Sequence, residues 1–327
     1  DNAGLLLDMG LGKTLISINI ARYRIQNNGV KKVLVVCPNT IMYSWEKSIK
    51  RFSEYKSLIV NASPEERIYR ALDKDHKFHI LGYGSLYPLL DSVGVWKYER
   101  TKDGKKKRVL DKLDALWEFG YNMVIFDESA KFLRNYSSQR SIASNLFTDY
   151  AKYRLILTGT LIANRPYDIY QQFRVLDGGK EFGLSYYSFL GKYFDKIFRK
   201  THNEFILKRR YYKKFTEKIY KHCIRFTRQE VLPDLPPVVK DTRIVPLDNY
   251  SRDEYEKIKQ KTIAEIETSV GKRDVSIFSI FTKLIRVSQI ASGFIGYDNG
   301  KVAELKATPK LDALIEEIDT INDYGES

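Results

Sequence analysis

A glycine-rich string near the start of the chain has the residue types of a phosphate-binding loop. Its members are Met9, Gly10, Leu11, Gly12, Lys13 and Thr14. Glycine lets the backbone approach an anion and point several N–H groups at it. The lysine that follows can reach the β- and γ-phosphates of a nucleotide, and the next hydroxyl can hold a magnesium ion. The string therefore predicts a site for a nucleoside triphosphate and Mg²⁺.

The residues on either side of this string predict the strand and the helix that such a loop requires. An apolar run at 5–7 precedes it, and residues 15–25 have helical spacing. The N-terminus of that helix would turn its positive dipole end toward the same anion. One position departs from the pattern G-x-x-x-x-G-K-[ST], because Leu7 stands where the first glycine would be. Taken alone, the string also fits a glycine-rich turn before an ordinary helix.

Two adjacent acids end a second, mostly apolar run at 121–126. Consecutive apolar residues without alternation predict a central parallel strand that is covered on both faces. Asp127 would then lie at the carboxyl edge of the sheet, where α/β folds bind ligands, and could hold Mg²⁺ together with Thr14. Glu128 would be placed to orient or deprotonate an attacking water. We therefore predict Lys13, Asp127 and Glu128 as catalytic residues; a pair of solvated acids at a strand end is the plainer alternative.

Alternating segments predict the sheet that brings the loop and the acids together. We expect strands at 31–38, 76–83, 121–127 and 151–160, and helices at 15–25, 41–52, 113–120 and 138–147. Such alternation gives a parallel sheet flanked by helices, so the expected fold class is α/β. The charged stretch 98–110 predicts a surface hairpin that turns at Asp103-Gly104.

Composition and cysteine usage exclude several classes of protein. With 327 residues, 43% hydrophobic and 29% charged, the chain is long enough for two or more globular domains. No apolar run is long enough to span a bilayer, so no membrane partner is expected. Cys37 and Cys223 are the only cysteines, which argues against a disulfide scaffold and predicts a reducing, intracellular compartment. The chain lacks an initiator methionine, and we expect it to be a fragment of a longer protein.

A strongly basic segment follows the predicted sheet. The net charge of the chain is +14, and residues 192–228 hold thirteen Lys or Arg against three acids. Such a block predicts a polyanion partner, although a solvated helical surface has a similar composition. Most of the interleaved aromatic residues are expected to pack a helical core, with a minority free to stack on bases.

The composition also changes after about Gly178. Basic, aromatic stretches with helical character continue to a proline cluster at 233–237, the clearest boundary in the chain. Beyond it, residues 242–247 predict a short strand, and 250–292 and 310–318 predict helices. We therefore expect a nucleotide-binding lobe, a basic aromatic-rich helical protrusion with its connector, and the truncated start of a further lobe, at 1–177, 178–240 and 241–327.

Four segments occur in an order that resembles the Swi/Snf family of DNA-translocating ATPases in helicase superfamily two. They are residues 5–14, 33–49, 124–135 and 155–173. The later stretches 228–239 and 307–318 are similar to the family's proline-rich connector and the start of its second motor lobe. The resemblance covers nearly the whole chain. It implies a RecA-like lobe of a P-loop NTPase, with ATP bound between this lobe and a second motor lobe in the same protein.

The resemblance gives the matching segments expected roles in ATP hydrolysis. The string at 9–14 corresponds to the Walker A motif, and Asp127 and Glu128 correspond to the Walker B acids that hold magnesium and activate water. Three further residues match the motif that links hydrolysis to the grip on DNA, since their hydroxyls can hydrogen-bond the Walker B acids. These coupling residues are Thr158, Gly159 and Thr160.

The resemblance also implies contacts to the backbone of duplex DNA, without sequence readout. Pro38, Asn39 and Thr40 match a segment that touches one DNA strand, and Tyr83 begins a second such turn. A strand-to-helix turn capped by Thr40 is the alternative. In the basic segment we expect three consecutive cations to guide the duplex, namely Lys208, Arg209 and Arg210.

The chain departs from the family pattern in several places. Ala130 stands where a histidine is usual, and Leu161 where a proline is usual. Residues 164–170 are more similar to divergent or phage-encoded members than to chromatin remodelers. The chain also holds neither the upstream glutamine motif nor the arginine finger of the second lobe, whose loss costs on the order of 10³ or more in rate. We therefore expect the isolated chain to bind nucleotide weakly and to hydrolyse ATP very slowly.

The sequence leaves three functions open. The first is an ATP-dependent translocase on duplex DNA, which the connector and the basic insertion favour. The second is an RNA or single-strand helicase of the same superfamily, whose first-lobe motifs are nearly the same. The third is a non-catalytic DNA-binding scaffold, which the complete set of Lys13, Thr14, Asp127 and Glu128 disfavours.

Overall fold

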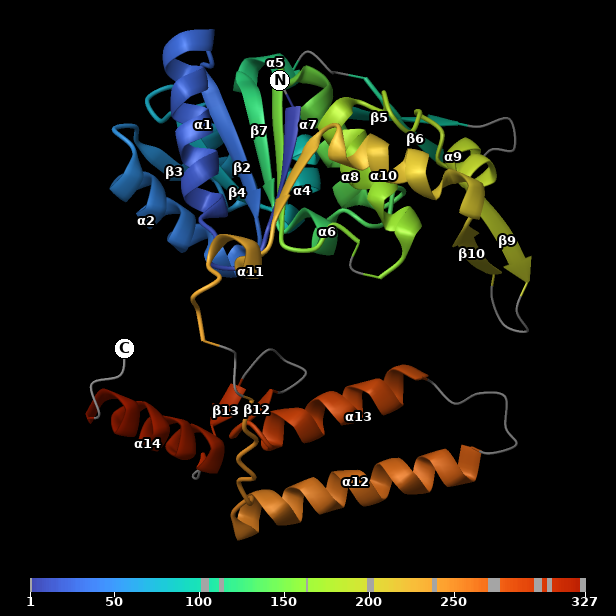
Figure 1. The fold of residues 1–327 in the computed structure, drawn as a ribbon. Helices are drawn as coiled ribbons and strands as arrows, with labels where there is room; N and C mark the ends of the chain where they lie inside the picture. Colours follow the sequence, from blue (N-terminus) through green and yellow to red (C-terminus); the bar gives the residue numbers. More distant parts are fainter. Residues whose placement is uncertain are drawn as a thin grey trace. The chain divides into compact units, whose positions relative to one another are not determined.

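The computed structural model describes most of the chain as two compact units. The described residues are 2–100, 106–111, 115–162, 164–198, 203–236, 240–269, 277–296, 302–304 and 308–323. The first unit is Asp1–Leu235 and the second is Pro236–Ser327 (Figure 1). The boundary between them lies inside the proline cluster that the sequence marks as the clearest break.

The first unit is built on a seven-stranded sheet in which all neighbouring strands run parallel. The strands in spatial order are β11 (Cys223–Phe226), β1 (Asn2–Leu7), β8 (Tyr153–Thr158), β7 (Tyr121–Asp127), β2 (Lys32–Cys37), β4 (Phe78–Gly82) and β3 (Ser57–Ile59). The expected α/β fold class is confirmed. Because the strands are parallel, the loops that follow them share one edge of the sheet.

The central strands are continuously apolar because both faces of the sheet are buried. Along β1, Leu5 and Leu7 belong to one hydrophobic cluster and Leu6 to the other. Along β2, Val33 and Val35 likewise alternate with their neighbours between the two clusters. Successive side chains of a strand point to opposite faces, so an uninterrupted apolar run is needed to fill two cores.

Helices cover the two faces of the sheet (Figure 1). One face is covered by α1 (Lys13–Asn28) and α2 (Met42–Phe52). The other face is covered by α3 (Pro64–Leu72), α4 (Leu86–Ser92), α5 (Ala115–Phe119), α7 (Gln139–Tyr150) and α8 (Ile169–Asp177). Gly29 ends α1 in the left-handed conformation and donates its N–H to the Arg24 carbonyl, which is the usual glycine stop signal.

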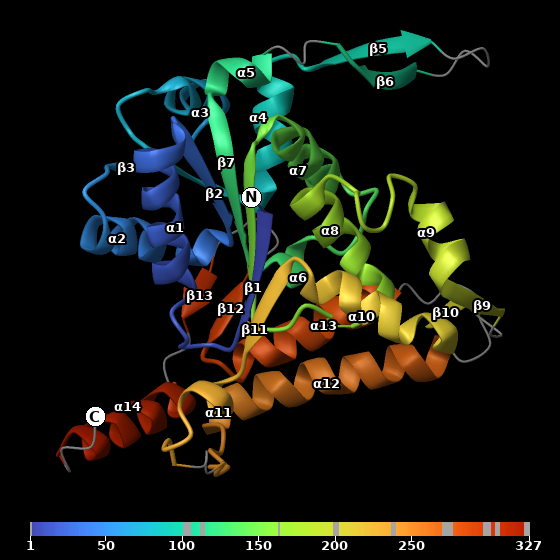
Figure 2. The same ribbon diagram turned by 45° about the horizontal axis from the view of Figure 1, so that its top comes forward.

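The charged stretch between α4 and α5 forms the hairpin that its sequence predicts. Strands β5 (Trp96–Arg100) and β6 (Lys106–Leu110) pair antiparallel, and Figure 2 shows them extending away from the main sheet. The expected turn at Asp103-Gly104 lies outside the described residues.

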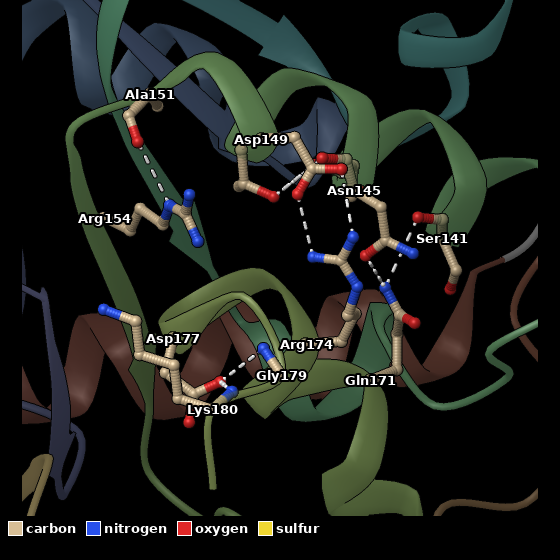
Figure 3. Close-up of polar contacts among 12 residues, drawn as sticks. Ser141, Asn145, Asp149, Ala151, Arg154, Gln171, Arg174, Asp177, Gly179 and Lys180 are labelled. Atoms are coloured by element: carbon tan, nitrogen blue, oxygen red, sulfur yellow. Dashed lines mark hydrogen bonds and ion pairs between the residues drawn. The ribbon is translucent and has the colours of Figure 1, made fainter. Parts of the chain in front are cut away.

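Polar contacts join α7 to α8 and shape the turn that follows α8 (Figure 3). Arg174 holds Asp149 through two 2.9 Å hydrogen bonds, one to each carboxylate oxygen. The Asp177 carboxylate accepts the backbone N–H groups of three successive residues, Gly179 (2.7 Å), Lys180 (3.1 Å) and Glu181 (3.0 Å). These bonds fix the direction in which the chain leaves the sheet region after α8.

The segment after Gly178 is not purely helical, and this expectation was wrong. It contains α9 (Tyr186–Tyr193), β9 (Phe194–Phe198), β10 (Asn203–Leu207), the 3₁₀ turn η4 (Arg209–Tyr211), α10 (Tyr212–Tyr220), β11 and α11 (Arg228–Val231). β9 and β10 pair antiparallel, and β11 pairs with β1 in the main sheet. The aromatic and β-branched residues Phe194, Ile197 and Phe198 of β9 and Phe205 and Ile206 of β10 favour strands over a helix.

Aromatic side chains join this segment to the core of the first unit. Phe182, Phe189, Tyr193, Phe194 and Phe215 are almost fully buried and belong to the same hydrophobic cluster as the sheet residues. Burial of each such ring contributes about 1.5–3 kcal/mol relative to exposure. The residues at 178–235 therefore share the core of the first unit, and the functional roles assigned to 178–240 and 241–327 stay predictions.

The second unit is mainly helical, as expected. It contains α12 (Asn249–Ser269), α13 (Ile277–Ile290), β12 (Phe294–Gly296), β13 (Val302–Glu304) and α14 (Pro309–Asp323). The strand predicted at 242–247 is not formed. Pro246 has no N–H for a strand ladder, and Arg243 forms ion pairs with Glu316 and Glu317 of α14 instead. Among the described helices of the whole chain, none has the length and apolar character needed to cross a membrane.

Candidate nucleotide-binding site

The glycine-rich string forms the turn between β1 and α1. Gly10 and Gly12 have φ angles of 87° and 75°, a left-handed backbone that glycine adopts without steric cost. Gly12 is the N-cap of α1, so the free N–H groups of the first helical turn open onto this loop. The Lys13 Nζ donates to the carbonyls of Leu7 at 2.7 Å and Asp8 at 3.1 Å. The Lys13 side chain thus folds back over the loop in which it would bind phosphate.

The two acids lie at the carboxyl end of β7. Asp127 is the last residue of the strand and is 6% exposed. Its Oδ1 accepts the Glu128 N–H at 2.9 Å, and its Oδ2 accepts the Trp45 indole N–H at 2.8 Å. Glu128 has a φ of 52°. In the described part of the chain it is the one non-glycine residue with a positive φ. That conformation costs about 1 kcal/mol or more, and such strain occurs preferentially at functional sites.

The loop and the acids are brought to one edge of the sheet. In the strand order, β8 alone separates β1 from β7. Burial raises the pKa of both Asp127 and Glu128, and the Lys13 ammonium acts in the opposite direction on each of them. The loop after β1 and the acids at the end of β7 therefore share this edge of the sheet.

The donor groups at this edge fit a magnesium ion. Mg²⁺ prefers oxygen ligands, and the Asp127 carboxylate and the Thr14 hydroxyl in the first turn of α1 supply them. Each Asp127 oxygen accepts one hydrogen bond and keeps a lone pair for a metal or a metal-bound water. These two residues would hold the ion.

The coupling residues lie at the end of β8 and in the turn that follows it, beside the end of β1. A Cβ placed on Gly159 would meet the Leu7 carbonyl at 3.5 Å, so this turn packs directly on the end of β1. The expected hydrogen bond from Thr158 to the acids was wrong, because its hydroxyl donates to the Thr160 carbonyl at 3.1 Å. Thr158 is buried and stabilises its own turn, while Thr160 is exposed.

The turn expected to touch DNA lies at the end of β2, the strand next to β7. Asn39 and Thr40 are exposed, and Pro38 is half-buried. The 3₁₀ turn η1 (Asn39–Ile41) leads into α2, whose N-cap is Ile41 without a side-chain hydrogen bond. The segment is thus a turn from strand to helix, as the alternative has it, but Thr40 does not cap the helix.

Tyr83 cannot touch DNA with its side chain, and that expectation was wrong. The residue begins the 3₁₀ turn η2 (Tyr83–Ser85) after β4, but it is only 2% exposed. Its hydroxyl donates to the Asp127 carbonyl at 2.8 Å. The residue type and position suggested a surface contact, whereas the fold turns the ring inward.

The chain matches the SNF2-related domain over residues 1–292. It belongs to the SNF2-related domain family. The resemblance to Swi/Snf proteins that the motifs predict is thereby confirmed.

Relatives of this SNF2-related domain include remodelling and helicase proteins. It is 23% identical to the CHD3-type chromatin-remodeling factor PICKLE of Arabidopsis thaliana, over 86% of this chain and 19% of that protein. It is 25% identical to the DNA annealing helicase and endonuclease ZRANB3 of Homo sapiens, over 81% of this chain and 23% of that protein. The chain thus spans about a fifth of the length of these relatives.

The fold of this SNF2-related domain has a solved counterpart. The Sulfolobus solfataricus SWI2/SNF2 ATPase core in complex with dsDNA aligns with a TM-score of 0.51 and 20% sequence identity. The alignment covers 99% of this chain and 61% of the other. At this identity the likeness concerns the fold, and it agrees with the RecA-like lobe that the motifs predict.

The basic segment of the SNF2-related domain is partly engaged in its own structure. The Lys208 Nζ donates to the carbonyls of Gly191 at 2.6 Å and Lys192 at 3.3 Å, at the C-terminal end of α9. A cation there satisfies carbonyls that lack a helical partner. Lys208 thus has a structural role that its sequence position did not reveal. Arg209 and Arg210 are exposed.

Several functional candidates are visible only in the folded SNF2-related domain. Trp45 reaches Asp127 across 82 positions of sequence. Gln172, fully buried, contacts the residue after the acid pair. Arg228 donates its Nη2 to the Met9 carbonyl at 2.9 Å, and its backbone N–H to the Asp8 carboxylate at 2.9 Å. A tryptophan or glutamine within an amphipathic helix gives no local signal of such a contact.

Proposed function

We propose that this SNF2-related domain is the first motor lobe of an ATP-dependent translocase on duplex DNA. The observation that carries the proposal is the meeting of Lys13, Asp127 and Glu128 at one edge of the sheet, beside a glycine turn that opens onto a helix N-terminus. That arrangement supplies a cation for the phosphates, oxygen ligands for a metal and a carboxylate for water.

The proposed roles follow from what each group can do. Lys13 exchanges its bonds to the Leu7 and Asp8 carbonyls for the β- and γ-phosphates. Thr14 and Asp127 hold Mg²⁺, which when bound neutralises phosphate charge. Glu128 orients the attacking water and accepts its proton, and the burial that raises its pKa makes it a stronger base than an exposed glutamate.

DNA is the proposed partner, and its backbone is the part contacted. The exposed turn at 38–40 lies on the same edge as the nucleotide site, and the chain carries a net charge of +14. The names of the two relatives mention chromatin remodelling and DNA annealing, and that of the solved core mentions dsDNA. Arg209 and Arg210 would add long-range attraction for the duplex. A second motor lobe in the same protein would complete the ATP site.

The direct test is the binding of Mg²⁺ and a fluorescent, non-hydrolysable ATP analogue to the chain. Lys13→Ala should weaken binding at least tenfold, because it removes the cation that faces the phosphates. Lys47→Ala removes one cation from α2, away from the loop, and serves as the matched control. Equal affinities for wild type and Lys13→Ala would contradict the proposal.

Two further measurements separate the alternative functions. In a protein with both motor lobes, ATPase stimulation by duplex DNA, single-stranded DNA and RNA distinguishes a duplex translocase from a single-strand helicase. Lys13→Ala and Glu128→Gln should each abolish that activity. If neither variant changes it, the chain serves as a scaffold.

A further inference from the structure

The carboxylate and backbone of Asp127 are held by donors from three parts of the chain. The Trp45 indole N–H, from α2, donates to Oδ2 at 2.8 Å. The Tyr83 hydroxyl, from η2, donates to the Asp127 carbonyl at 2.8 Å, and the Glu128 N–H donates to Oδ1 at 2.9 Å. Trp45 is 1% exposed and Tyr83 is 2% exposed, so both side-chain bonds are shielded from water.

Both donors belong to turns at the edge where nucleic acid is proposed to bind. β7, β2 and β4 are consecutive in the sheet, so the ends of these strands lie side by side. Trp45 is in the first turn of α2, five positions after the exposed residue Thr40, and Tyr83 is the first residue of η2. The two donors therefore lie close in sequence to the proposed DNA-facing turns.

The two turns are also packed against each other. A Cβ placed on Gly82, the residue before Tyr83, would overlap the Asn39 Oδ1. The absence of a side chain at Gly82 is what allows the Asn39 amide to rest there. The Asn39 side chain thus lies against the Gly82 backbone.

A basic cavity lies beside Tyr83 and could bind an anion. Its volume is about 440 Å³, and its lining includes Tyr83, Lys131, Arg134 and Arg140. The Arg140 guanidinium lies 5.9 Å from the centroid of the Tyr83 ring, which is within the range of a cation–π contact. A backbone phosphate of the nucleic acid is the ligand that such cations and this position suit. The phosphate would then lie beside Lys131, Arg134 and Arg140, while the buried Tyr83 hydroxyl holds Asp127.

We propose that Trp45 and Tyr83 are positioning residues that couple the Asp127 carboxylate to a nucleic-acid backbone bound at the turns 38–41 and 83–85. The inference rests on the proposed function and adds to it a route between the two ligands. Binding of DNA shifts the turns, the turns carry the two donors, and the donors reorient Asp127 for Mg²⁺ and nucleotide. Because coupling is reciprocal, bound nucleotide changes the affinity for DNA by the same factor.

The coupling factor is the quantity to measure. Affinity for Mg²⁺ and the fluorescent ATP analogue is determined with and without a saturating 20-base-pair duplex, and the ratio of the two is the factor. We expect a ratio on the order of tenfold in the wild type, within the usual range of coupling energies. Tyr83→Phe keeps the ring and removes the donor, and Trp45→Phe removes the donor and leaves a smaller aromatic ring. Each should bring the ratio to within about twofold of one. Trp117→Phe, which alters an exposed indole, should keep the wild-type ratio.

The ratio separates coupling from a merely structural role. A variant that only loosens the fold weakens both affinities and leaves their ratio unchanged. A wild-type ratio in both Trp45→Phe and Tyr83→Phe, or a ratio of one in the wild type, would overturn the inference while the proposed function stands. If the wild type bound neither ligand, the proposed function would fall first, and the inference with it.

A second measurement follows the tryptophan indole N–H resonances of the wild-type chain by NMR while duplex DNA is added. The chain has three tryptophans, so its ¹⁵N-labelled indole region holds three resonances, and loss of one in Trp45→Phe assigns it. Addition of duplex DNA without nucleotide should shift the Trp45 indole resonance, because its partner Asp127 is reoriented. The Trp117 resonance should stay in place. An unmoved Trp45 resonance in the presence of bound duplex overturns the proposal.

Discussion

The Gln172 side chain bridges Ser129 and the turn after the coupling residues. The Ser129 hydroxyl donates to the Gln172 Oε1 at 3.0 Å, and the Gln172 Nε2 donates to the Leu161 carbonyl at 2.9 Å. Ser129 and Gln172 are fully buried. Ser129 follows the acid pair and Leu161 follows Thr160, so this bridge joins the acids to the coupling turn. It does so in a chain that has Ala130 where the family usually has a histidine.

Gln172→Leu tests how strongly the bridge holds the two segments. Leucine has a similar size but leaves the Ser129 hydroxyl and the Leu161 carbonyl without this partner, at a cost of about 1–3 kcal/mol. We expect the unfolding free energy, measured by urea denaturation, to fall by about that amount. Ser129→Ala in the Gln172→Leu background removes the Ser129 hydroxyl, one of the two groups left without a partner. The unfolding free energy of the double variant should therefore fall by less than the sum of the two single decreases. Strict additivity would show that the two residues do not act together.

The packing of Asn39 on Gly82 makes a second prediction, about DNA. Gly82 has φ −72° and ψ 145°, which any residue adopts, so Gly82→Ala is costly only because its methyl group would collide with the Asn39 amide. We expect the asparagine to be displaced and the affinity for duplex DNA to drop by about 0.5–1.5 kcal/mol, the worth of one hydrogen bond.

The matched control for this prediction is the Asn39→Ala variant. It should lose the same affinity by itself, and Gly82→Ala should then cost nothing more, because the collision no longer exists. Gel-shift titration of duplex DNA with wild type, Gly82→Ala, Asn39→Ala and the double variant gives the four affinities of this double-mutant cycle. A further loss in the double variant would mean that Gly82 acts in some other way.

Glu181 makes the stability of the first unit dependent on acid pH. Hydrogen bonds from Lys218 (2.5 Å), Lys221 (2.7 Å) and His222 (3.2 Å) lower its pKa from 4.5 to about 2. A depressed carboxyl pKa stabilises the fold above the unfolded value and loses that contribution as the pH falls from about 4.5 toward 2. Lys221 is exposed and its interaction is screened, so we expect a contribution of about 1–2 kcal/mol at pH 7.

The measurement is the difference in unfolding free energy between wild type and Glu181→Gln across this pH range. The difference should be largest at neutral pH and should shrink steadily below pH 4.5. Glu217→Gln removes an exposed acid of α10 and reports the general effect of losing one negative charge. A difference that stays constant from pH 7 to pH 3 would rule out the Glu181 linkage.

The three neighbouring cations of the basic segment should separate into two classes. Arg209 and Arg210 are exposed, so the pair of charge reversals Arg209→Glu and Arg210→Glu should weaken DNA binding and reduce the salt slope by about 0.9 for each DNA phosphate that is no longer neutralised. Lys208 is bonded to α9 carbonyls, and Lys208→Met should mainly lower the unfolding free energy, by about 0.5–1.5 kcal/mol.

The dependence of log affinity on log salt for duplex DNA is the measurement that distinguishes them. An unchanged slope in the Arg209→Glu, Arg210→Glu variant would remove this segment from the DNA interface. A slope lowered equally by Lys208→Met would show that its ammonium leaves the helix end to reach phosphate.

The sequence determined the features that depend on short spacing. A glycine turn between an apolar run and a helix, and two acids after a buried strand, are local patterns, and parallel strands place both at one edge. The hairpin at 98–110 and the unit boundary near Leu235 likewise follow from local sequence.

Tertiary structure decided which side chains support the acids. Trp45 meets Asp127 and Gln172 meets Ser129 because helices from distant parts of the chain pack on the same sheet. Tyr83 turns inward and Lys208 folds onto α9 because burial of a ring and satisfaction of helix-end carbonyls outweigh exposure. β11 joins β1 since an open sheet edge offers unpaired backbone groups. Such contacts depend on three-dimensional proximity, which residue spacing along the chain does not encode.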